Sequence, residues 1–438
     1  MSLVPPDTVR KLQETLHAKA KRAPGYRFYA LYDKVYRADV LLHAYRCCAA
    51  NDGAAGVDGQ TFADIEKYGV GPWLDVLTEE LRKRTYRPEA VRRVFIPKPD
   101  GKQRPLGIPT VKDRVVQMAV LLVLEPIFEA DLLPEQYAYR PGRSALDALV
   151  EVQKLLKAGY TEIVDADLSG YFDSIPHADL LKSVARRVSD GGLLALIKRW
   201  LEAPVEETDE RGRKHRTNRH RDEGRGTPQG APLSPLLANL YMRRFLLGWK
   251  KLGHERRLHA RIVNYADDFV ICCRNTAAAA MTAMRDLMTR LKLTVNEAKT
   301  RQCRVPDESF TFLGYTFGRN WSPRRGRAYT GLRPSAKKIA ALCAAIGEQT
   351  SRRWLWLAPE ELVGNLNRQL TGWANYFCLG AVAKAYRHVM AYTGQRLRQW
   401  LGRKYRVRVQ GGRKRPTLYL CRELGLVWLP ALPRPRLL

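Results

Sequence analysis

The chain contains little that would build a zinc site, a disulfide framework or a membrane span. Its 438 residues include only eight cysteines, and no two of them form a Cys-x-x-Cys pair. The longest apolar stretch, residues 118–128, is interrupted by Glu125 and Pro126 and is too short to cross a bilayer. The first residues lack the apolar core of a signal peptide. We therefore expect a protein of a reducing cytoplasm with no membrane partner.

Acidic residues are also scarce. Lysine and arginine total 75 against 44 acids, which gives a formal net charge of +31 and a pI near 10.0. Between Glu361 and Glu423 no acid occurs, while thirteen lysines or arginines do. An excess of this size favours a polyanionic partner, because basic side chains neutralise backbone phosphates.

Two adjacent acids, Asp267 and Asp268, lie within the run 263–271 between short apolar segments. This pattern predicts a β-hairpin with the acids at its turn. Neighbouring carboxylates repel each other unless a cation bridges them, and Mg²⁺ is the hard cation that carboxylates and phosphates share. Two metals about 3.5–4 Å apart can stabilise both the attacking and the leaving oxygen of a phosphoryl transfer. The motif alone leaves a solvated turn as the alternative, since Asp is common in turns.

A partner strand is predicted at the apolar start of residues 163–176, which carry three further acids, Asp165, Asp167 and Asp173. Gly170 and Pro176 indicate a break soon after. Between the two acidic segments, the Gly- and Pro-rich residues 226–235 predict a turn. A helix should begin after Ser234 with Pro235 in its first turn.

In this order the segments resemble the sequence blocks of reverse transcriptases encoded by bacterial group II introns. The similarity runs from about residue 50 to about residue 400, and eight blocks in sequence make it specific. The blocks lie at residues 56–59, 96–109, 137–144, 163–176, 226–237, 265–268, 293–300 and 312–315. Residues 370–377, Leu-Thr-Gly-Trp-Ala-Asn-Tyr-Phe, resemble the thumb or maturase region, which in that family grips intron RNA and assists splicing.

The resemblance implies an α+β fold: a right-hand polymerase with an antiparallel palm sheet, followed by a helical thumb/maturase domain. We expect a helical extension over 1–60, fingers and palm over 61–320, the thumb/maturase domain over 328–405, and a basic tail over 406–438 without a nuclease domain. The polar residues 206–225 predict an exposed loop or hairpin, either solvated or in contact with nucleic acid, and residues 319–327 a basic loop joining palm to thumb. One face of a thumb helix is predicted by the spacing of Leu362, Leu366, Leu370, Trp373 and Phe377.

The resemblance also implies roles for individual residues. Asp167, Asp267 and Asp268 match the catalytic carboxylates that hold two Mg²⁺ ions, with the backbone carbonyl of Leu168 as a further ligand. Asp165 and Asp173 match no ligand position. The match assigns the incoming dNTP to Lys98, Arg104, Phe172 and Gln229. Phe172 would lie under the 2′ position of the sugar, with a plain core aromatic as the alternative.

Expected nucleic-acid contacts come from the second fingers block, the 293–300 block and the basic thumb. They are Arg140, Arg143, Lys299, Arg387, Arg396, Arg398, Arg403, Lys404 and Arg406. For Lys299 a helix-surface lysine is an equal alternative. The implied partners are intron RNA, an RNA template with a DNA primer, a DNA target and dNTPs, with the oligomeric state open. Two other functions stay open: a host-adopted reverse transcriptase without splicing, and a maturase that only binds RNA.

Overall fold

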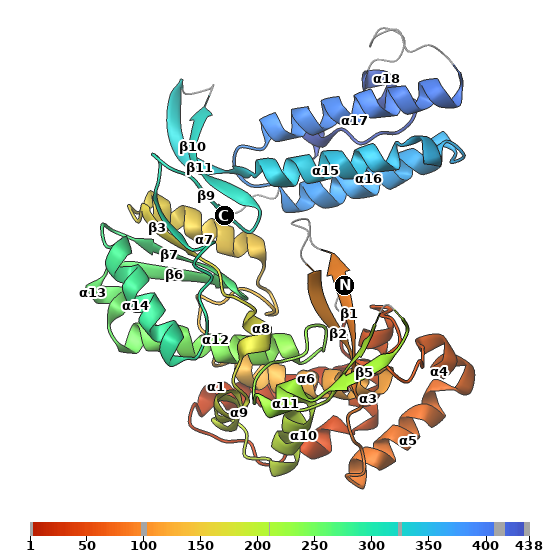
Figure 1. Cartoon of the computed structure of the whole chain (residues 1–438), viewed down its shortest axis with the longest axis vertical. Coiled ribbons are helices and arrows are strands. Elements are labelled where there is room, and N and C mark those ends of the chain that lie inside the picture. The colour runs from red at the N-terminus through yellow and green to blue at the C-terminus, as the bar shows by residue number, and fades with distance from the viewer. Residues whose placement is uncertain (1–2, 98–102, 210, 323–325, 407–416, 433–438) are drawn as a thin grey trace.

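The computed structural model describes residues 3–97, 103–209, 211–322, 326–406 and 417–432. Helices around a long central helix fill one end of the molecule, the palm sheet lies in the middle, and three long helices form the other end (Figure 1). The predicted α+β right-hand fold is confirmed. None of the helices within these ranges combines the length and the apolar character that a membrane crossing needs.

The apolar stretch at 118–128 forms the core of the N-terminal end. It belongs to α6 (Val111–Glu129), which is buried on nearly all sides and packs against α1 (Asp7–Arg22) and α3 (Ala38–Ala49). Pro126 is tolerated within the helix. The neighbouring helices are α2 (Tyr32–Val35), α4 (Phe62–Tyr68), α5 (Val70–Arg82), α9 (His177–Ala185) and α10 (Gly191–Leu201).

The palm sheet has the strand order β6-β7-β3-β8 and is antiparallel throughout, as predicted. Its strands are β6 (Ala260–Tyr265), β7 (Asp268–Cys273), β3 (Glu162–Ala166) and β8 (Arg301–Arg304). Both faces are covered, because its strands alternate between two apolar clusters. One face packs on α14 (Ala277–Arg290) and α12 (Ser234–Lys251), and the other on α7 (Ala145–Lys157).

The fingers sheet combines two hairpins in the order β2-β1-β4-β5. β1 (Val91–Pro97) and β2 (Gln103–Ile108) form the first, and β4 (Val205–Thr208) and β5 (Lys214–Thr217) the second. The predicted exposed loop or hairpin at 206–225 is therefore a hairpin, followed by α11 (Arg219–Asp222). Its pairing with β1 makes it part of the fingers rather than a detached loop.

A third sheet lies between palm and thumb, with the strands β9 (Phe310–Phe312), β10 (Tyr315–Ser322) and β11 (Arg327–Pro334) in the order β11-β10-β9. The prediction of a loop at 319–327 was wrong for the described part of that segment. Residues 319–322 pair with residues 327–330, so the two strands continue as one long hairpin. Exposed Trp321 and the basic residues obscured the strand pattern in the sequence.

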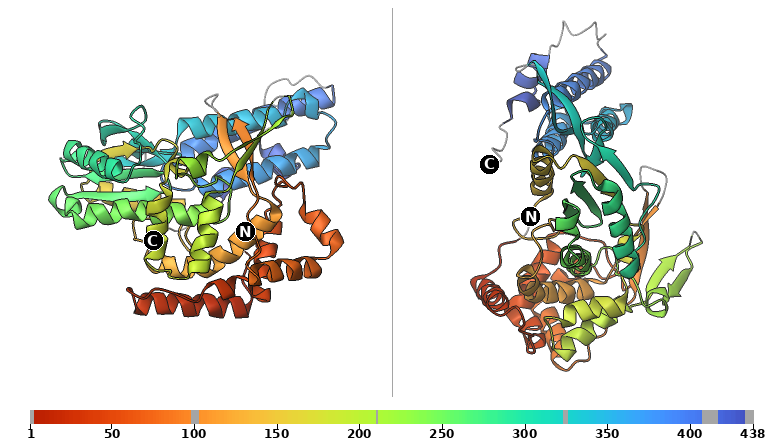
Figure 2. Two further views of the ribbon diagram at one scale, coloured as in Figure 1. Left: turned by 60° about the horizontal axis from the view of Figure 1, so that its bottom comes forward. Right: turned by 90° about the vertical axis from the view of Figure 1, so that its left-hand side faces the viewer.

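The thumb is a bundle of α15 (Ala336–Gln349), α16 (Pro359–Tyr376) and α17 (Ala383–Lys404), with α18 (Thr417–Arg422) beside α17 (Figures 1 and 2). The predicted helix face is confirmed. Leu362, Leu366 and Leu370 are buried against Ile346 and Trp400. Residues 328–334, expected in the thumb, lie in β11, so the helical body begins at Ala336.

Candidate active site

The two adjacent acids lie at a tight hairpin turn, as predicted. Tyr265 at the end of β6 pairs with Asp268 at the start of β7, which leaves Ala266 and Asp267 as the two turn residues. Ala266 adopts a φ of 58°, a conformation that costs a residue with a Cβ about 1 kcal/mol. The Asn264 Nδ2 group donates a hydrogen bond of 2.8 Å to the Ala266 carbonyl. The buried surroundings thus hold the strained turn that presents the acids.

Strand register brings the third acid to the same place. β3 pairs with β7 so that Ala166 faces Phe269 and Asp165 faces Val270. Continuing this register by one residue sets Asp167 opposite Asp268. Residues directly opposite each other in an antiparallel pair share one face of the sheet. Asp167 and Asp268 therefore lie at the end of the face that carries Val270, next to the Asp267 turn.

Mutual repulsion among these acids is visible in their ionisation. Desolvation by the surrounding protein, followed by the charges of Asp267, Asp167 and Asp165, raises the pKa of Asp268 to about 7 although its side chain reaches solvent. Desolvation also raises the pKa of Asp165 to about 6, against the opposing effect of Arg301. A cation among these carboxylates would reverse this penalty.

Asp167 is already held by polar partners. Its Oδ2 atom accepts a 3.0 Å hydrogen bond from Asn296 Nδ2 and lies 3.0 Å from the Lys299 ammonium. The backbone N–H of Asn296 also donates a hydrogen bond to the backbone carbonyl of Asp167. Lys299 lies in a turn beside the acids and not on a helix surface. Asn296 was not among the expected site residues; its place in the 293–300 block beside Lys299 was the available signal.

The backbone hydrogen bonds that join residues 167–169 to residues 294–296 do not involve Leu168. Leu168 forms an isolated bridge with Val295, and the bonds of that bridge use the Asp167 carbonyl and the Ser169 amide instead. Asp165 is turned to Arg301 of β8, 3.7 Å away, and Asp173 to Gln229. These contacts agree with the choice of Asp167 over the other two acids.

The loop 226–230 joins the fingers to the palm. The Gly107 amide of β2 donates to the Gln229 carbonyl at 2.6 Å, and Gln229 Nε2 donates to Asp173 at 3.1 Å. Gly230 has a φ of 116°, and a Cβ there would lie 2.5 Å from the Gly107 carbonyl. Glycine is required at 230 by both the conformation and the close approach of β2.

Phe172 is bonded to this loop through its backbone. Phe172 belongs to the short helix α8 (Tyr171–Ser174), is 9% exposed, and accepts a 2.7 Å hydrogen bond from the Thr227 amide through its carbonyl. Arg104 lies in β2, paired with Ile96. Lys98 lies outside the described residues.

The expected nucleic-acid contacts of the second fingers block are used internally. The Arg140 side chain is 5% exposed, binds the Glu129 carboxylate at 2.6 Å, and donates to the carbonyls of Leu133 and Gln136. Because these partners occupy the donor groups of its guanidinium, Arg140 cannot also bind a phosphate. Arg143 is half-buried, donates to the Pro134 carbonyl and lies over the Tyr137 ring.

The basic thumb residues divide into two groups. Arg387, Arg403 and Arg406 are exposed. Arg396 instead donates to Gly347 and Thr350 at the end of α15, and Lys404 donates to the carbonyls of Leu355 and Leu357, each at 2.9 Å. Arg398 is half-buried. The first group can meet a phosphate backbone, whereas Arg396 and Lys404 hold the thumb helices together.

The residues at the palm turn suit a hard divalent ion, because they offer carboxylate and carbonyl oxygens and a lysine cation already stands against one acid. Among the described residues, no three His, Cys, Asp or Glu side chains converge tightly enough to form a preassembled metal site. The match between these residues and a divalent cation therefore depends on the type of ligand atoms and on the repulsion between the carboxylates, and not on a preformed coordination shell.

Comparison with known proteins agrees with this geometry. Residues 96–317 match the family model "Reverse transcriptase (RNA-dependent DNA polymerase)", and residues 339–417 match "Group II intron, maturase-specific domain". The first match spans the fingers and palm sheets with the acids. The second spans the thumb helices.

Individual relatives give the same result. Protein YkfC of Escherichia coli (strain K12) is 32% identical over 349 residues, which cover 70% of this chain and 87% of the relative. The group II intron-encoded protein LtrA of Lactococcus lactis subsp. cremoris is 34% identical over 223 residues, covering 49% of this chain and 34% of LtrA. Nuclear intron maturase 2 of Arabidopsis thaliana is 37% identical over 94 residues, covering 22% and 13%. The chain belongs to the group II intron-encoded reverse transcriptases, RNA-directed DNA polymerases that carry a maturase domain.

Proposed function

We propose that the chain copies an RNA template from a DNA primer at the turn formed by Asp167, Asp267 and Asp268, with two Mg²⁺ ions. The observation that supports this proposal is the register of β3 and β7, which, continued by one residue beyond Ala166 and Phe269, puts Asp167 opposite Asp268 beside the Asp267 turn. Three carboxylates on one edge, with the pKa of Asp268 raised to about 7, form a site that gains from binding cations.

The chemistry follows from these positions. Mg²⁺ held by these carboxylates would lower the pKa of a primer 3′-hydroxyl and would stabilise the pyrophosphate leaving group. Asp167 and Asp268 supply carboxylates from facing strands, Asp267 supplies a third from the turn, and the Leu168 carbonyl can supply a neutral oxygen. Asn296 orients Asp167 by its 3.0 Å hydrogen bond. Lys299, paired with the same carboxylate, is available for a phosphate once the acids are neutralised.

The dNTP would lie between this edge and the fingers. Arg104 comes from β2, and Lys98 directly follows β1 in the sequence; both would neutralise the triphosphate, one as a planar fork and one as a point charge. Gln229 would contact the sugar from the loop that is fastened to β2. Phe172 would close the floor under the 2′ position.

The thumb would hold RNA. Arg387, Arg403 and Arg406 are exposed on and beyond α17, where each guanidinium could meet the phosphate backbone of intron RNA or of a primer–template duplex. Mobility of the intron would add a DNA target as a further partner. The eight cysteines are all free thiols, which fits a reducing bacterial cytoplasm.

The decisive experiment separates the two activities. Asp268→Asn removes one ligand charge and relieves repulsion, so the fold and the thumb surface should persist. We expect at least a hundred-fold slower primer extension, roughly the scale of a lost metal ligand, together with unchanged intron RNA binding and splicing assistance. Asp307→Asn is the control, since Asp307 is an exposed acid between β8 and β9.

If a folded Asp268→Asn protein extended primers at the normal rate, the assignment of these acids to the active site would be wrong. If no RNA flanking the reading frame is ever spliced with the help of the protein, the maturase half of the proposal fails while the polymerase half stands.

A further inference from the structure

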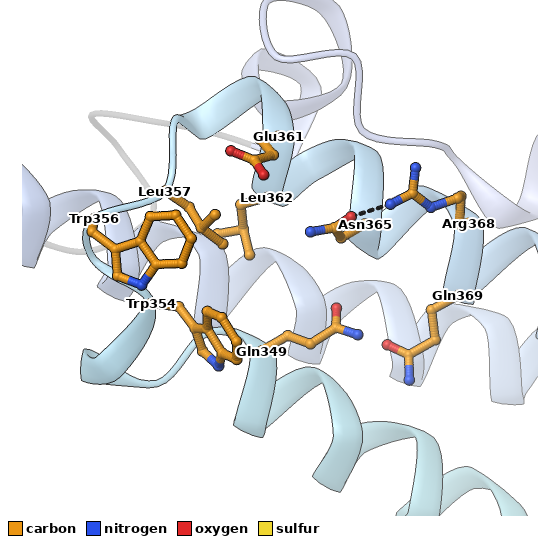
Figure 3. Close-up of a pocket in the computed structure, with 9 residues that line it drawn as sticks. All are labelled: Gln349, Trp354, Trp356, Leu357, Glu361, Leu362, Asn365, Arg368 and Gln369. Atoms are coloured by element: carbon orange, nitrogen blue, oxygen red, sulfur yellow. Dashed lines mark hydrogen bonds between the residues drawn. The ribbon is translucent and has the colours of Figure 1, made fainter. Parts of the chain in front are cut away.

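A pocket of about 610 Å³ opens at the end of the thumb, where α15 leads into α16 (Figure 3). Its volume lies within the range of about 300–1,000 Å³ typical of ligand sites. α15 begins directly after β11 and the pocket lies at its last residue, Gln349, so the length of the helix, roughly 20 Å, separates the pocket from the sheet β9–β11. The pocket is therefore distinct from the Asp167–Asp268 site.

One side of the pocket is aromatic. Trp354 and Trp356 lie together, with ring centroids 6.0 Å apart and an interplanar angle of 42°. Trp356 is 70% exposed, so its indole adds little to the thumb core. An indole face left open to solvent offers a stacking surface for a planar ring.

The opposite side carries amides and a guanidinium. Figure 3 shows Asn365, Arg368 and Gln369 across from the two tryptophans. Of the fifteen buried side-chain N or O atoms without a partner among the described residues, three belong to residues that line the pocket: Gln349 Oε1, Trp354 Nε1 and Gln369 Oε1. A buried polar atom without a partner costs free energy, so such a concentration indicates a site that is completed by something else.

Two of these three atoms are acceptors, the carbonyl oxygens of Gln349 and Gln369, and Trp354 Nε1 is a donor. Glu361 lines the same pocket as an exposed carboxylate and adds further acceptor oxygens. A planar ligand for this pocket must therefore donate hydrogen bonds at its edge. Among the four RNA bases only guanine presents two adjacent donor groups, N1–H and N2–H₂, on its Watson–Crick edge, and a carboxylate can accept from both.

We propose that this thumb pocket binds an unstacked guanine of RNA, stacked on Trp356 and read by Glu361. Arg368 lines the pocket and Arg352 is exposed beside it, so the phosphates that flank the base would meet positive charge. That the guanine belongs to intron RNA rests on the proposed maturase function. The pocket itself does not depend on the polymerase chemistry.

The test measures equilibrium binding of two fluorescein-labelled RNA pentanucleotides, UUGUU and UUAUU, to the full chain at one salt concentration with EDTA. Binding to the general basic surface contributes equally to both. We expect the parent to bind UUGUU about ten-fold more tightly, the scale of a charge-assisted hydrogen-bond pair. Glu361→Gln should abolish the preference.

Matched variants isolate each part. Glu360→Gln makes the same charge change in the same first turn of α16 but outside the pocket, and should keep the preference. Trp356→Ala should weaken UUGUU binding about five-fold or more, the usual cost of a lost stacking partner, and Trp356→Phe should restore most of it. All four variants should extend primers like the parent, because the pocket lies far from the palm.

Equal binding of the two pentanucleotides by the parent would overturn the proposal, and so would a preference that survives both Glu361→Gln and Trp356→Ala. Loss of splicing in Trp356→Ala without any change in pentanucleotide binding would also overturn it, because the pocket would then serve a protein partner. In each case primer extension by the parent reports separately on the polymerase proposal.

Discussion

Phe172 is expected to serve both core packing and the choice between ribose and deoxyribose. It is 9% exposed, and its ring contacts that of Tyr171 edge to face with the ring centroids 5.8 Å apart. Phe172→Ala should raise the ratio of ribonucleotide to deoxyribonucleotide incorporation, because the wall against the 2′-hydroxyl is gone. It should also lower the free energy of unfolding by about 3 kcal/mol.

Single-nucleotide incorporation of dNTPs and rNTPs by both proteins gives the ratio. Tyr171→Phe is the control, since it removes only the 2.7 Å hydrogen bond to the Ala238 carbonyl. That variant should lose about 1 kcal/mol of stability and keep its sugar preference. An unchanged ratio in Phe172→Ala would make Phe172 a core aromatic and nothing more.

Asp113, a buried acid far from the palm, should make the free energy of unfolding depend on pH. Its carboxylate is 2% exposed and accepts hydrogen bonds from the Tyr86 hydroxyl and the Glu89 amide. Burial raises the pKa of Asp113 to about 6. Because the folded protein holds this proton more tightly than the unfolded chain, the contribution of Asp113 to stability falls as pH rises from about 4 to about 6.

Asp113→Asn removes this titration. The free energy of unfolding of the parent minus that of the variant should therefore decrease by up to about 3 kcal/mol between about pH 4 and about pH 7. Denaturant unfolding of both proteins at the two pH values measures it, and every other titrating group cancels in the difference. A difference that is constant with pH would show that Asp113 ionises normally.

At the scale of elements, the loop 226–230 couples the fingers to the palm. Gly230→Ala would place a Cβ 2.5 Å from the Gly107 carbonyl at a φ of 116°, so the loop must move away from β2. We expect a loss of stability of more than about 2 kcal/mol and a larger fall in primer extension than in RNA binding. Gly224→Ala is the control, because Gly224 has a φ of 61° with no atom within 4 Å, and should cost only about 1 kcal/mol. Equal effects of the two variants would contradict the coupling.

The elements themselves were largely predictable. The acid hairpin, the strand before Asp167, the helix from Ser234 and the apolar face of α16 follow from periods of two and 3.6 residues and from turn chemistry, all of which are local. β10 and β11 were missed because exposed basic and aromatic residues mask their alternation.

At the scale of the whole molecule, the net charge of +31 should make RNA binding steeply dependent on salt. Charge reversal at Arg387, Arg403 and Arg406 should reduce the slope of log K against log salt by about 0.7 for each lost contact on single-stranded RNA. Arg396→Ala should instead destabilise the thumb and leave the slope intact, since its guanidinium is bound to Gly347 and Thr350. A slope near zero in the parent would contradict the electrostatic interpretation.

The sequence by itself determined the family, the strands and helices that carry the acids, and the basic character of the thumb, because each depends on neighbouring residues or on composition. Only the tertiary structure decided which of these groups meet. Asp167 faces Asp268 through a strand register spanning about a hundred residues of chain. The sequence predicts nucleic-acid contacts at Arg140 and Arg396, yet the carboxylate and carbonyl groups that bind these side chains become neighbours only when the chain folds. A charge count cannot distinguish a free guanidinium from a buried one, because burial and pairing are properties of packed elements and not of the local sequence.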